Sequence, residues 1–312
     1  MNKMEKVYTR DVYGQTLLEL GKKHQDLVVL DADLSGSTRT VFFSREFPER
    51  FFNFGVAEQN MMATAAGIAS SGKIVFASTF AMFAAVRALD QVRNSICYNN
   101  FNVKIVATHG GITVGEDGAS HQALEDINIF RAIPNMKIIV PADGPQTRDA
   151  IITAYQTPGP FYVRLGRSKN PTIFKENDFT FGKGQIVEEG KDLAIITCGI
   201  MLNEALIASK ILKEKGISVT VANFHTIKPI DNELLIDIAK KHKKILVCEE
   251  HQIIGGLFSA VSEVLIQKCP TQVKPIGIKD EFGQSGSPQE LMDFYGLSAN
   301  NIAEKADQFL RQ

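Results

Sequence analysis

Two histidines and two acidic residues lie close together in one glycine-rich segment of this 312-residue chain. The segment, THGGITVGEDGASHQ (residues 108–122), contains His109, Glu116, Asp117 and His121 together with four glycines. The glycines give a pliable backbone, and we expect few apolar residues nearby to anchor it. Loops often carry functional residues, and an ordinary surface loop seldom holds so many ionisable groups. We therefore predict a polar substrate site here.

A single glutamate, Glu58, occupies a second position suited to chemistry. In FFNFGVAEQNM (residues 51–61), a strand-like stretch stops at Gly55 and a helix opens around Glu58. This places the carboxyl group at the C-terminal edge of a strand, where open α/β sheets bind ligands. Its sequence neighbours are Phe, Val, Ala and Met, so we expect partial desolvation, which favours the protonated form. The alternative is an ordinary glutamate in the first turn of a helix, where it meets the helix dipole.

Two phenylalanines form the third feature. In STFAMF (residues 78–83), Phe80 and Phe83 lie three residues apart at the start of a predicted helix that Thr79 caps. Both rings then lie on one face and form a flat apolar slot suited to an aromatic ring, although ordinary core packing explains the spacing equally well. The remaining polar candidates, Arg10, Ser37 and Arg167, lie at element edges. Singly, each has the character of a solvated surface residue.

Short apolar runs alternate with helix-like segments and position these residues. Strands are predicted at 27–31, 73–78, 103–108, 136–140 and 161–165, with helices from Thr9, from Phe80 to Tyr98, and over 144–156. A second series follows, with strands at 193–199, 217–224, 243–250 and 273–279 and helices at 202–215, 231–241 and 256–267. This alternation is typical of an α/β fold with mostly parallel sheets. We predict a first domain over 1–168, a linker over 169–190 and a smaller domain over 191–312.

Composition and missing motifs exclude several classes of protein. Lys plus Arg is 34 and Asp plus Glu is 35, so the net charge of -1 argues against a nucleic-acid binder. No apolar run is long enough to span a membrane, and the N-terminal residues resemble no secretory signal. Four cysteines without C-x-x-C spacing are expected to be reduced, so we expect a cytoplasmic protein. The sequence contains no G-x-G-x-x-G, G-x-S-x-G or H-E-x-x-H motif.

At these residues the chain resembles the transketolase family. The similar segments are GVAEQNM, STFAMF, GITVGEDGASHQALEDI, DADLSGS and EEHQIIGG, and the resemblance covers essentially the whole chain. It implies two doubly wound α/β domains: a pyrimidine-binding domain for thiamine diphosphate and a smaller transketolase C-terminal-like domain. It also implies transfer of a two-carbon ketol unit between phosphorylated sugars, as in the pentose phosphate pathway.

The resemblance also implies roles for individual residues. Glu58 matches the catalytic glutamate that hydrogen-bonds N1′ of the cofactor's aminopyrimidine, and Asp33 falls among the cofactor-binding positions. Phe80 and Phe83 match the positions that stack on the pyrimidine ring. Where the family often has a third aromatic residue, this chain has Val86.

The substrate positions follow in the same way. His121 matches a catalytic residue beside the reacting carbons, and Asp117 matches one that contacts a sugar hydroxyl. Four positions match residues that bind the sugar phosphate, namely Arg10, Ser37, His109 and Arg167. Arginine suits this task because its guanidinium can contact a phosphate with two parallel hydrogen bonds.

One departure from the family pattern is large. The family's diphosphate domain has GDG followed about 25 residues later by Asn, whereas this chain has only EDG inside the loop at 116–118. The chain therefore resembles the C-terminal half of a transketolase made as a separate subunit. We expect an N-terminal partner subunit that carries GDG and Mg²⁺, a heterotetramer with that partner, and self-association of the lone chain as a dimer.

Three alternatives stay open from the sequence. One is the β subunit of a 2-oxoacid dehydrogenase E1 component, which shares the fold, and another is half of a deoxyxylulose-phosphate-synthase-like enzyme. The third is a non-catalytic α/β module that regulates a partner.

Overall fold

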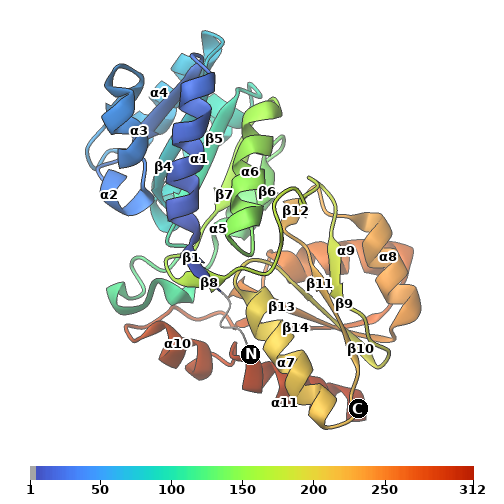
Figure 1. Ribbon diagram of the computed structural model, residues 1–312. Coiled ribbons are helices and arrows are strands. Elements are labelled where there is room, and N and C mark those ends of the chain that lie inside the picture. Colours follow the sequence, from blue (N-terminus) through green and yellow to red (C-terminus); the bar gives the residue numbers. More distant parts are fainter. Residues whose placement is uncertain (1–4) are drawn as a thin grey trace.

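Two large sheets, each covered by helices, make up most of the structure (Figure 1). The computed structural model describes residues 5–312. Residues 1–4 lie outside the described residues; they include the start of the predicted first domain and of the N-terminal stretch in which we expect no secretory signal. Within 5–312 no helix is long and apolar enough to cross a bilayer.

The first half of the chain builds a seven-stranded sheet of order β12-β6-β7-β5-β4-β2-β3. All neighbouring pairs are parallel except β12–β6, in which an edge strand from the second half of the chain runs antiparallel. Its strands are β2 (Leu27–Asp31), β3 (Phe51–Asn53), β4 (Ile74–Phe80), β5 (Val103–Thr108), β6 (Lys137–Ile139), β7 (Phe161–Arg164) and β12 (Thr226–Lys228).

Helices cover both faces of this sheet. They are α1 (Thr9–Lys23), α2 (Ser35–Thr38), α3 (Val41–Glu46), α4 (Glu58–Ser70), α5 (Asp126–Arg131) and α6 (Gly144–Gln156), with short 3₁₀ turns η1 (Pro48–Arg50) and η4 (Ile112–Asp117) and π-helical segments η2 (Phe83–Arg87) and η3 (Gln91–Cys97). Leu27 and Val29 of β2 pack with α1 and α6, whereas Val28 and Leu30 pack with α4 on the other face. Burial on both faces explains why this strand has no alternation of apolar and polar residues.

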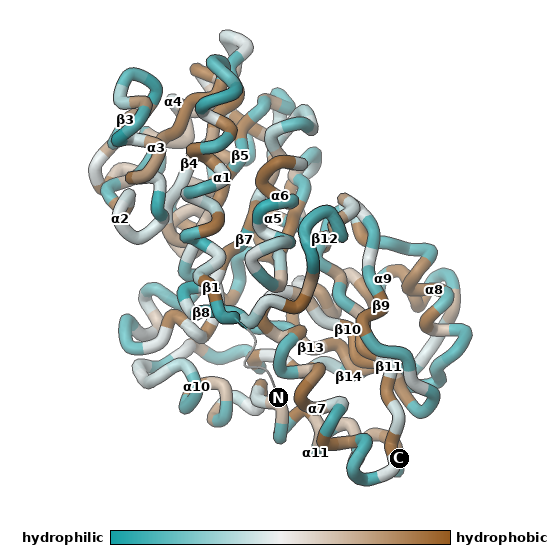
Figure 2. The backbone as a smooth tube through the Cα atoms, viewed as in Figure 1, coloured by the Kyte–Doolittle hydropathy of each residue, from teal (hydrophilic) through white to brown (hydrophobic). Residues whose placement is uncertain are grey.

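The second half builds a five-stranded sheet of order β14-β13-β10-β11-β9, with β9 antiparallel at one edge. Its strands are β9 (Gln185–Glu188), β10 (Leu193–Thr197), β11 (Val219–Asn223), β13 (Lys244–Gln252) and β14 (Gln272–Ile278). Its helices are α7 (Met201–Glu214), α8 (Asn232–Lys241), α9 (Leu257–Lys268), α10 (Pro288–Phe294) and α11 (Ala299–Arg311). The hydrophobic strands lie inside both halves (Figure 2). One cluster of buried side chains includes residues of both sheets.

The predicted linker contributes short strands to the fold. Within residues 169–190, β8 (Lys169–Pro171) pairs antiparallel with β1 (Lys6–Tyr8), and β9 joins the second sheet. The structure therefore confirms the predicted α/β class with two mixed, mostly parallel sheets. The exact domain boundaries stay a prediction.

Several local predictions were wrong. Thr9 is the first residue of α1 rather than its cap. Thr79 and Phe80 are the last residues of β4, and the predicted helix 80–98 is instead largely two π-helical segments. The helices α10 and α11 were not predicted at all. Neither hydroxyl caps a helix: among residues 5–312 the buried Oγ1 atoms of Thr9 and Thr79 have no hydrogen-bond partner.

Candidate active site

The C-terminal edge of the first sheet brings the candidate residues together. Strand β4 ends at Phe80 and its neighbour β5 ends at Thr108, one residue before His109. The ring centroids of Phe80 and His109 lie 3.8 Å apart and stack at 24°. Phe83 lies 5.8 Å from Phe80, and His121 meets the Phe83 ring edge-on at 5.3 Å. The two phenylalanines and the two histidines predicted from separate segments thus form one cluster.

Glu58 opens α4 as predicted, but its surroundings are not purely apolar. The side chain is 3% exposed, and its Oε1 accepts a hydrogen bond from Arg87 Nη1 at 2.9 Å. Arg87 ends the π-helical segment that begins at Phe83, and it is 45% exposed. The expected desolvation of Glu58 is therefore confirmed, but its setting is not purely apolar, because a residue 29 positions along the chain brings a positive charge to the carboxylate.

The guanidinium of Arg87 also lies over an aromatic ring. Its Cζ is 3.8 Å from the centroid of Phe83. A planar, nitrogen-bearing group thus contacts Glu58 and the face of Phe83 at the same time. An aminopyrimidine is also planar and nitrogen-bearing, so this arrangement fits the pyrimidine end of thiamine diphosphate. Val86, at the position of the family's third aromatic residue, is 50% exposed.

The predicted phosphate residues gather beside the histidine cluster. Arg10 Nη1 donates to the backbone oxygen of Ser37 at 3.2 Å, and the buried Arg10 Nε has no hydrogen-bond partner within residues 5–312. Burial, then the charges of Arg39 and Arg167, lower the pKa of Arg10. A buried guanidinium N–H without an acceptor is a donor available to an anion.

Arg167, a predicted phosphate residue, already has hydrogen-bond and ion-pair partners. Its Nη1 donates to Glu116 Oε2 at 3.0 Å and to the backbone oxygen of Val114, and Asp117 Oδ2 lies 3.9 Å away. Both acidic residues are largely exposed, and their ion pairs with Arg167 are therefore weak. A bound phosphate would compete with these carboxylates for the guanidinium.

His109 is buried and held neutral. Burial, then the charges of Arg10 and Arg167, lower its pKa to about 3, and its Nδ1 is hydrogen-bonded to Thr108 Oγ1 at 2.8 Å. At neutral pH it can offer a hydrogen bond but no positive charge. The positive charge of the predicted phosphate site therefore comes from the arginines.

The loop between His109 and Gln122 is anchored, contrary to the expectation from its glycines. Ile112 and Val114 are fully buried, and η4 packs against α10 of the second half. Gln122 Nε2 donates to the backbone oxygen of Gln284 at 2.8 Å. Ile112 and Val114 belong to the loop itself, but the helix α10 against which η4 packs lies far along the chain, so the sequence of the loop alone did not predict the anchoring.

The segment after β2 contains one predicted residue and one that was missed. Asp33 is exposed in a left-handed backbone conformation (φ 64°), and its Oδ1 accepts from Asn53 Nδ2 at 3.2 Å. The missed residue is Asp31, which is fully buried and accepts from the hydroxyls of Thr38 and Thr40 at 2.7 and 2.8 Å. Burial raises the pKa of Asp31 to about 6. These bonds hold the turn that carries Ser37.

Two other missed residues lie nearer to the candidate site. Arg87 follows Phe83 by four residues, a spacing that places both on one side of a helix and could have been noticed. Glu250 accepts a hydrogen bond from the backbone of Thr113, 137 residues earlier in the chain, and no local pattern predicts that contact. Within residues 5–312 no group of three His, Cys, Asp or Glu side chains is arranged to hold a metal ion.

Fold and site together define a pair of α/β domains in which a buried carboxylate and a cluster of aromatic rings lie at the C-terminal edge of the first sheet. Residues 5–172 match the family described as "Transketolase, pyrimidine binding domain", and residues 182–302 match "Transketolase, C-terminal domain". A "Putative transketolase C-terminal section" of Methanocaldococcus jannaschii is 53% identical over 98% of both chains. The chain belongs to the transketolase family.

Two further comparisons concern length and structure. The chain is 36% identical to human transketolase over 96% of its own residues but only 48% of the human protein. A solved structure described as "Split gene transketolase, inactive beta4 tetramer" has 49% identity and a TM-score of 0.91, and the match covers 98% of this chain and 99% of that one.

Proposed function

We propose that this chain is the C-terminal subunit of a split, thiamine-diphosphate-dependent transketolase that transfers a two-carbon ketol unit between phosphorylated sugars. The observation that carries the proposal is the position of Arg87, whose planar guanidinium contacts Glu58 and covers Phe83. An aminopyrimidine placed there would give its N1′ to Glu58 and its face to Phe83. When bound, thiamine diphosphate supplies a nucleophilic carbon that takes up the ketol unit.

The chain's own residues have distinct tasks in this proposal. Glu58 holds a proton at N1′ of the pyrimidine, and Phe80 and Phe83 orient the ring. His121, whose ring lies edge-on to that of Phe83 at 5.3 Å, is assigned to proton transfer at the reacting oxygens of the sugar. Asp117 hydrogen-bonds a sugar hydroxyl, and Asp33 contacts the cofactor from the exposed edge of the β2–β3 segment.

The phosphate of the sugar would lie between two arginines. Arg10 offers its Nε, which has no hydrogen-bond partner in the part of the chain that the structure describes, and Arg167 would exchange the Glu116 carboxylate for the phosphate. Neutral His109 and the Ser37 segment complete the site with hydrogen bonds. Charge-assisted bonds from arginine are the strongest type available to a phosphate in such a site.

A partner subunit completes the proposed enzyme. The residues of this chain that we assign to the cofactor would contact only its pyrimidine ring. We therefore assign the binding of the diphosphate and Mg²⁺ to a GDG-containing N-terminal subunit. Phe52 and Val56, shortly before Glu58 in the chain, and Val86, next to its partner Arg87, have exposed apolar side chains, at 46%, 73% and 50%. Such a patch favours burial against another chain. We propose a heterotetramer in the cytoplasm, with two active sites at the subunit junctions.

Without its partner, the chain is proposed to self-associate through the same patch into an inactive form. The relative described as an inactive beta4 tetramer supports self-association. The number of chains in the assembly formed by this protein is a matter for experiment. Analytical ultracentrifugation of the lone chain tests whether it is the expected dimer or a larger assembly.

The test of the proposed activity uses the chain mixed with a GDG-containing partner from the same genome. We expect ketol transfer from a ketose phosphate to an aldose phosphate, detected as a new sugar phosphate by mass spectrometry. The two alternative enzymes are distinguished in the same assay. Decarboxylation of a 2-oxoacid, with or without condensation onto an aldose phosphate, would replace this proposal by an E1-type or deoxyxylulose-phosphate-synthase-type function.

A further inference from the structure

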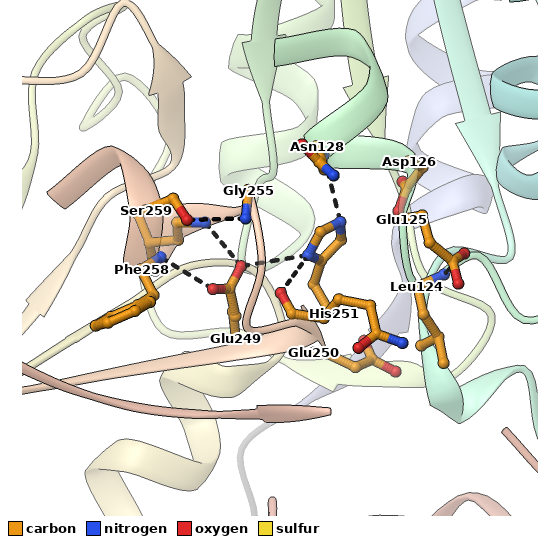
Figure 3. Close-up of polar contacts among 12 residues, drawn as sticks. Leu124, Glu125, Asp126, Asn128, Glu249, Glu250, His251, Gly255, Phe258 and Ser259 are labelled. Carbon is orange, nitrogen blue, oxygen red and sulfur yellow. Dashed lines mark hydrogen bonds and ion pairs between the residues drawn. The ribbon is translucent and has the colours of Figure 1, made fainter. Parts of the chain in front are cut away.

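Two neighbouring glutamates of β13 point to opposite sides of the strand (Figure 3). Glu249 accepts hydrogen bonds from the backbone N–H groups of Leu257 and Phe258, at 2.7 and 2.9 Å, and so caps α9 within its own domain. Glu250 is turned the other way, and its Oε1 accepts from the backbone N–H of Thr113 at 2.7 Å. Thr113 belongs to the first half of the chain, in the loop that carries the two histidines of the candidate site.

The start of this loop is fitted closely around two buried charges. A Cβ atom on Gly110 would lie 2.7 Å from Arg164 Nε, and one on Gly111 would lie 2.2 Å from the carboxyl carbon of Glu250. Gly111 also has a φ of +90°, which other residues rarely adopt. Only glycine lets the backbone come this close to the two side chains. Glu250 is 4% exposed, so this contact is shielded from water.

The segment held by these contacts, Gly110–Thr113, directly follows His109 in the chain. The backbone N–H of Gly110 donates to Leu165 O at 3.1 Å, and that of Gly111 donates to Ala123 O at 2.9 Å. These bonds tie the two ends of the loop together beside β7. His109 precedes Gly110 and stacks on Phe80 at 3.8 Å, so a shift of the Gly110–Thr113 backbone would move the His109 ring.

The place in the second sheet where a ligand could bind is filled by the first domain. Open α/β sheets bind ligands beyond the C-terminal ends of their strands, where the strand order reverses. In this sheet that point lies beside β10 and β13, next to Cys198, Gly199 and Glu250. Val140 and Arg164 of the first domain occupy it and leave a cavity of about 10 Å³. This edge of the second domain therefore contacts the first domain instead of a ligand.

We propose that Glu250 is a positioning residue that holds the Gly110–Thr113 backbone, and with it His109, in the geometry needed to bind the sugar phosphate. The C-terminal domain then helps to shape the active site and is not only a structural support. The catalytic part of this inference rests on the proposed transketolase function. The contact between Glu250 and the loop can be tested independently of it.

The first experiment is hydrogen–deuterium exchange on the full chain, with Glu249 as the matched control. Glu250→Ala removes the acceptor of Thr113 N–H, and we expect exchange of that amide to rise by roughly tenfold or more, because a hydrogen bond to a charged group is lost. Glu250→Gln keeps a weaker, neutral acceptor and should give a smaller rise. Glu249→Ala and Glu249→Gln should raise exchange at Leu257 and Phe258 but leave residues 109–123 unchanged.

Unchanged exchange in the loop of Glu250→Ala, or an equal rise in the Glu249 variants, would overturn the proposal. If Glu250→Ala does not fold, the Glu250→Gln and Glu249→Gln pair decides by the same criterion. These variants are neutral, similar in size and adjacent on one strand.

The second experiment measures activity of the same variants in the complex with the partner subunit. We expect Glu250→Ala to raise KM for the phosphorylated acceptor more than it lowers kcat, and Glu250→Gln to restore much of the loss. The Glu249 variants should keep KM near the wild-type value. Wild-type KM in Glu250→Ala despite a loosened loop would refute the positioning role. An inactive wild-type complex would instead refute the transketolase function, while the exchange result would still decide whether Glu250 holds the loop.

Discussion

Arg87 Nη1 lies 2.9 Å from Glu58 Oε1 while its guanidinium covers the ring of Phe83. Glu58 is buried, but Arg87 is half exposed and can swing into solvent without unfolding its surroundings. The arginine thus occupies the space between a carboxylate and an aromatic face that the proposed function assigns to the aminopyrimidine. Binding of the cofactor there requires Arg87 to move.

Removal of this arginine should strengthen cofactor binding slightly. We expect Arg87→Ala to tighten thiamine diphosphate binding to the complex by up to about fivefold, because a half-exposed ion pair is worth at most about 1 kcal/mol. Titration calorimetry with Mg²⁺ measures this, with Arg93→Ala on the neighbouring π-helical segment as the control. Markedly weaker binding in Arg87→Ala would mean that the arginine helps to bind the cofactor and does not merely occupy its position in the free protein.

Glu58 should be needed for turnover but not for folding. We expect Glu58→Gln and Glu58→Ala to reduce kcat of the complex by roughly 10²–10⁴-fold, the usual contribution of a positioned acid–base group. Their circular dichroism spectra should match the wild type, because the partner of Glu58 can become solvated. Glu19→Gln, which removes an exposed ion pair with Arg148, is the control. A wild-type kcat in Glu58→Ala would remove Glu58 from the mechanism.

Arg167 should distinguish phosphorylated from unphosphorylated acceptors. We expect Arg167→Ala to raise KM for an aldose phosphate about tenfold, the lower end for a charged hydrogen bond at a partly exposed site. Glu116→Gln frees the guanidinium and should lower the same KM. For unphosphorylated aldoses both changes should be small. An equal effect of Arg167→Ala on both kinds of acceptor would indicate a general defect and not a phosphate contact.

His109 should weaken the fold in mild acid. Its pKa is lowered to about 3 in the folded chain, from 6.5 as its ordinary value, mainly by burial. The unfolded chain therefore binds the proton first, and the stability contributed by neutral His109 is lost as the pH falls from 6.5 towards 3. Asp31, with its pKa raised to about 6, acts in the opposite direction, so a variant is needed to isolate His109.

The comparison is between the wild type and His109→Asn in urea unfolding at several pH values. Relative to the variant, the wild type should lose up to about 1.4 kcal/mol of unfolding free energy for each pH unit below 6.5. Loss of the stacking on Phe80 adds a constant offset that does not depend on pH. If the two stability curves run parallel between pH 7 and pH 4.5, His109 is not buried in its neutral form.

The sequence allowed the central strands of both sheets to be predicted, because their apolar runs are buried. The edge strands β9 and β12 were not predicted: β9 lies in the predicted linker, and β12 pairs with a strand from the first half of the chain. The end of the strand that precedes the helical segment η2 could not be predicted, because pairing with β5 continues β4 through Thr79 to Phe80. The same limit applies to the site. Glu58, His109 and His121 were found from residue type and local spacing, whereas Arg87 and Glu250 reach the site through folding. The anchoring of the loop at Ile112 could not be predicted, because it depends on the packing of η4 against α10, a helix that was itself not predicted.

Titration of thiamine diphosphate and Mg²⁺ into the lone chain, and then into the chain with its GDG-containing partner, tests the split-subunit proposal most directly. The lone chain should bind the cofactor weakly and show no ketol transfer, because its assigned cofactor residues address only the pyrimidine ring. Addition of the partner should produce both tight binding and turnover, with two cofactors for each heterotetramer. Tight binding with turnover by the lone chain would contradict the proposal.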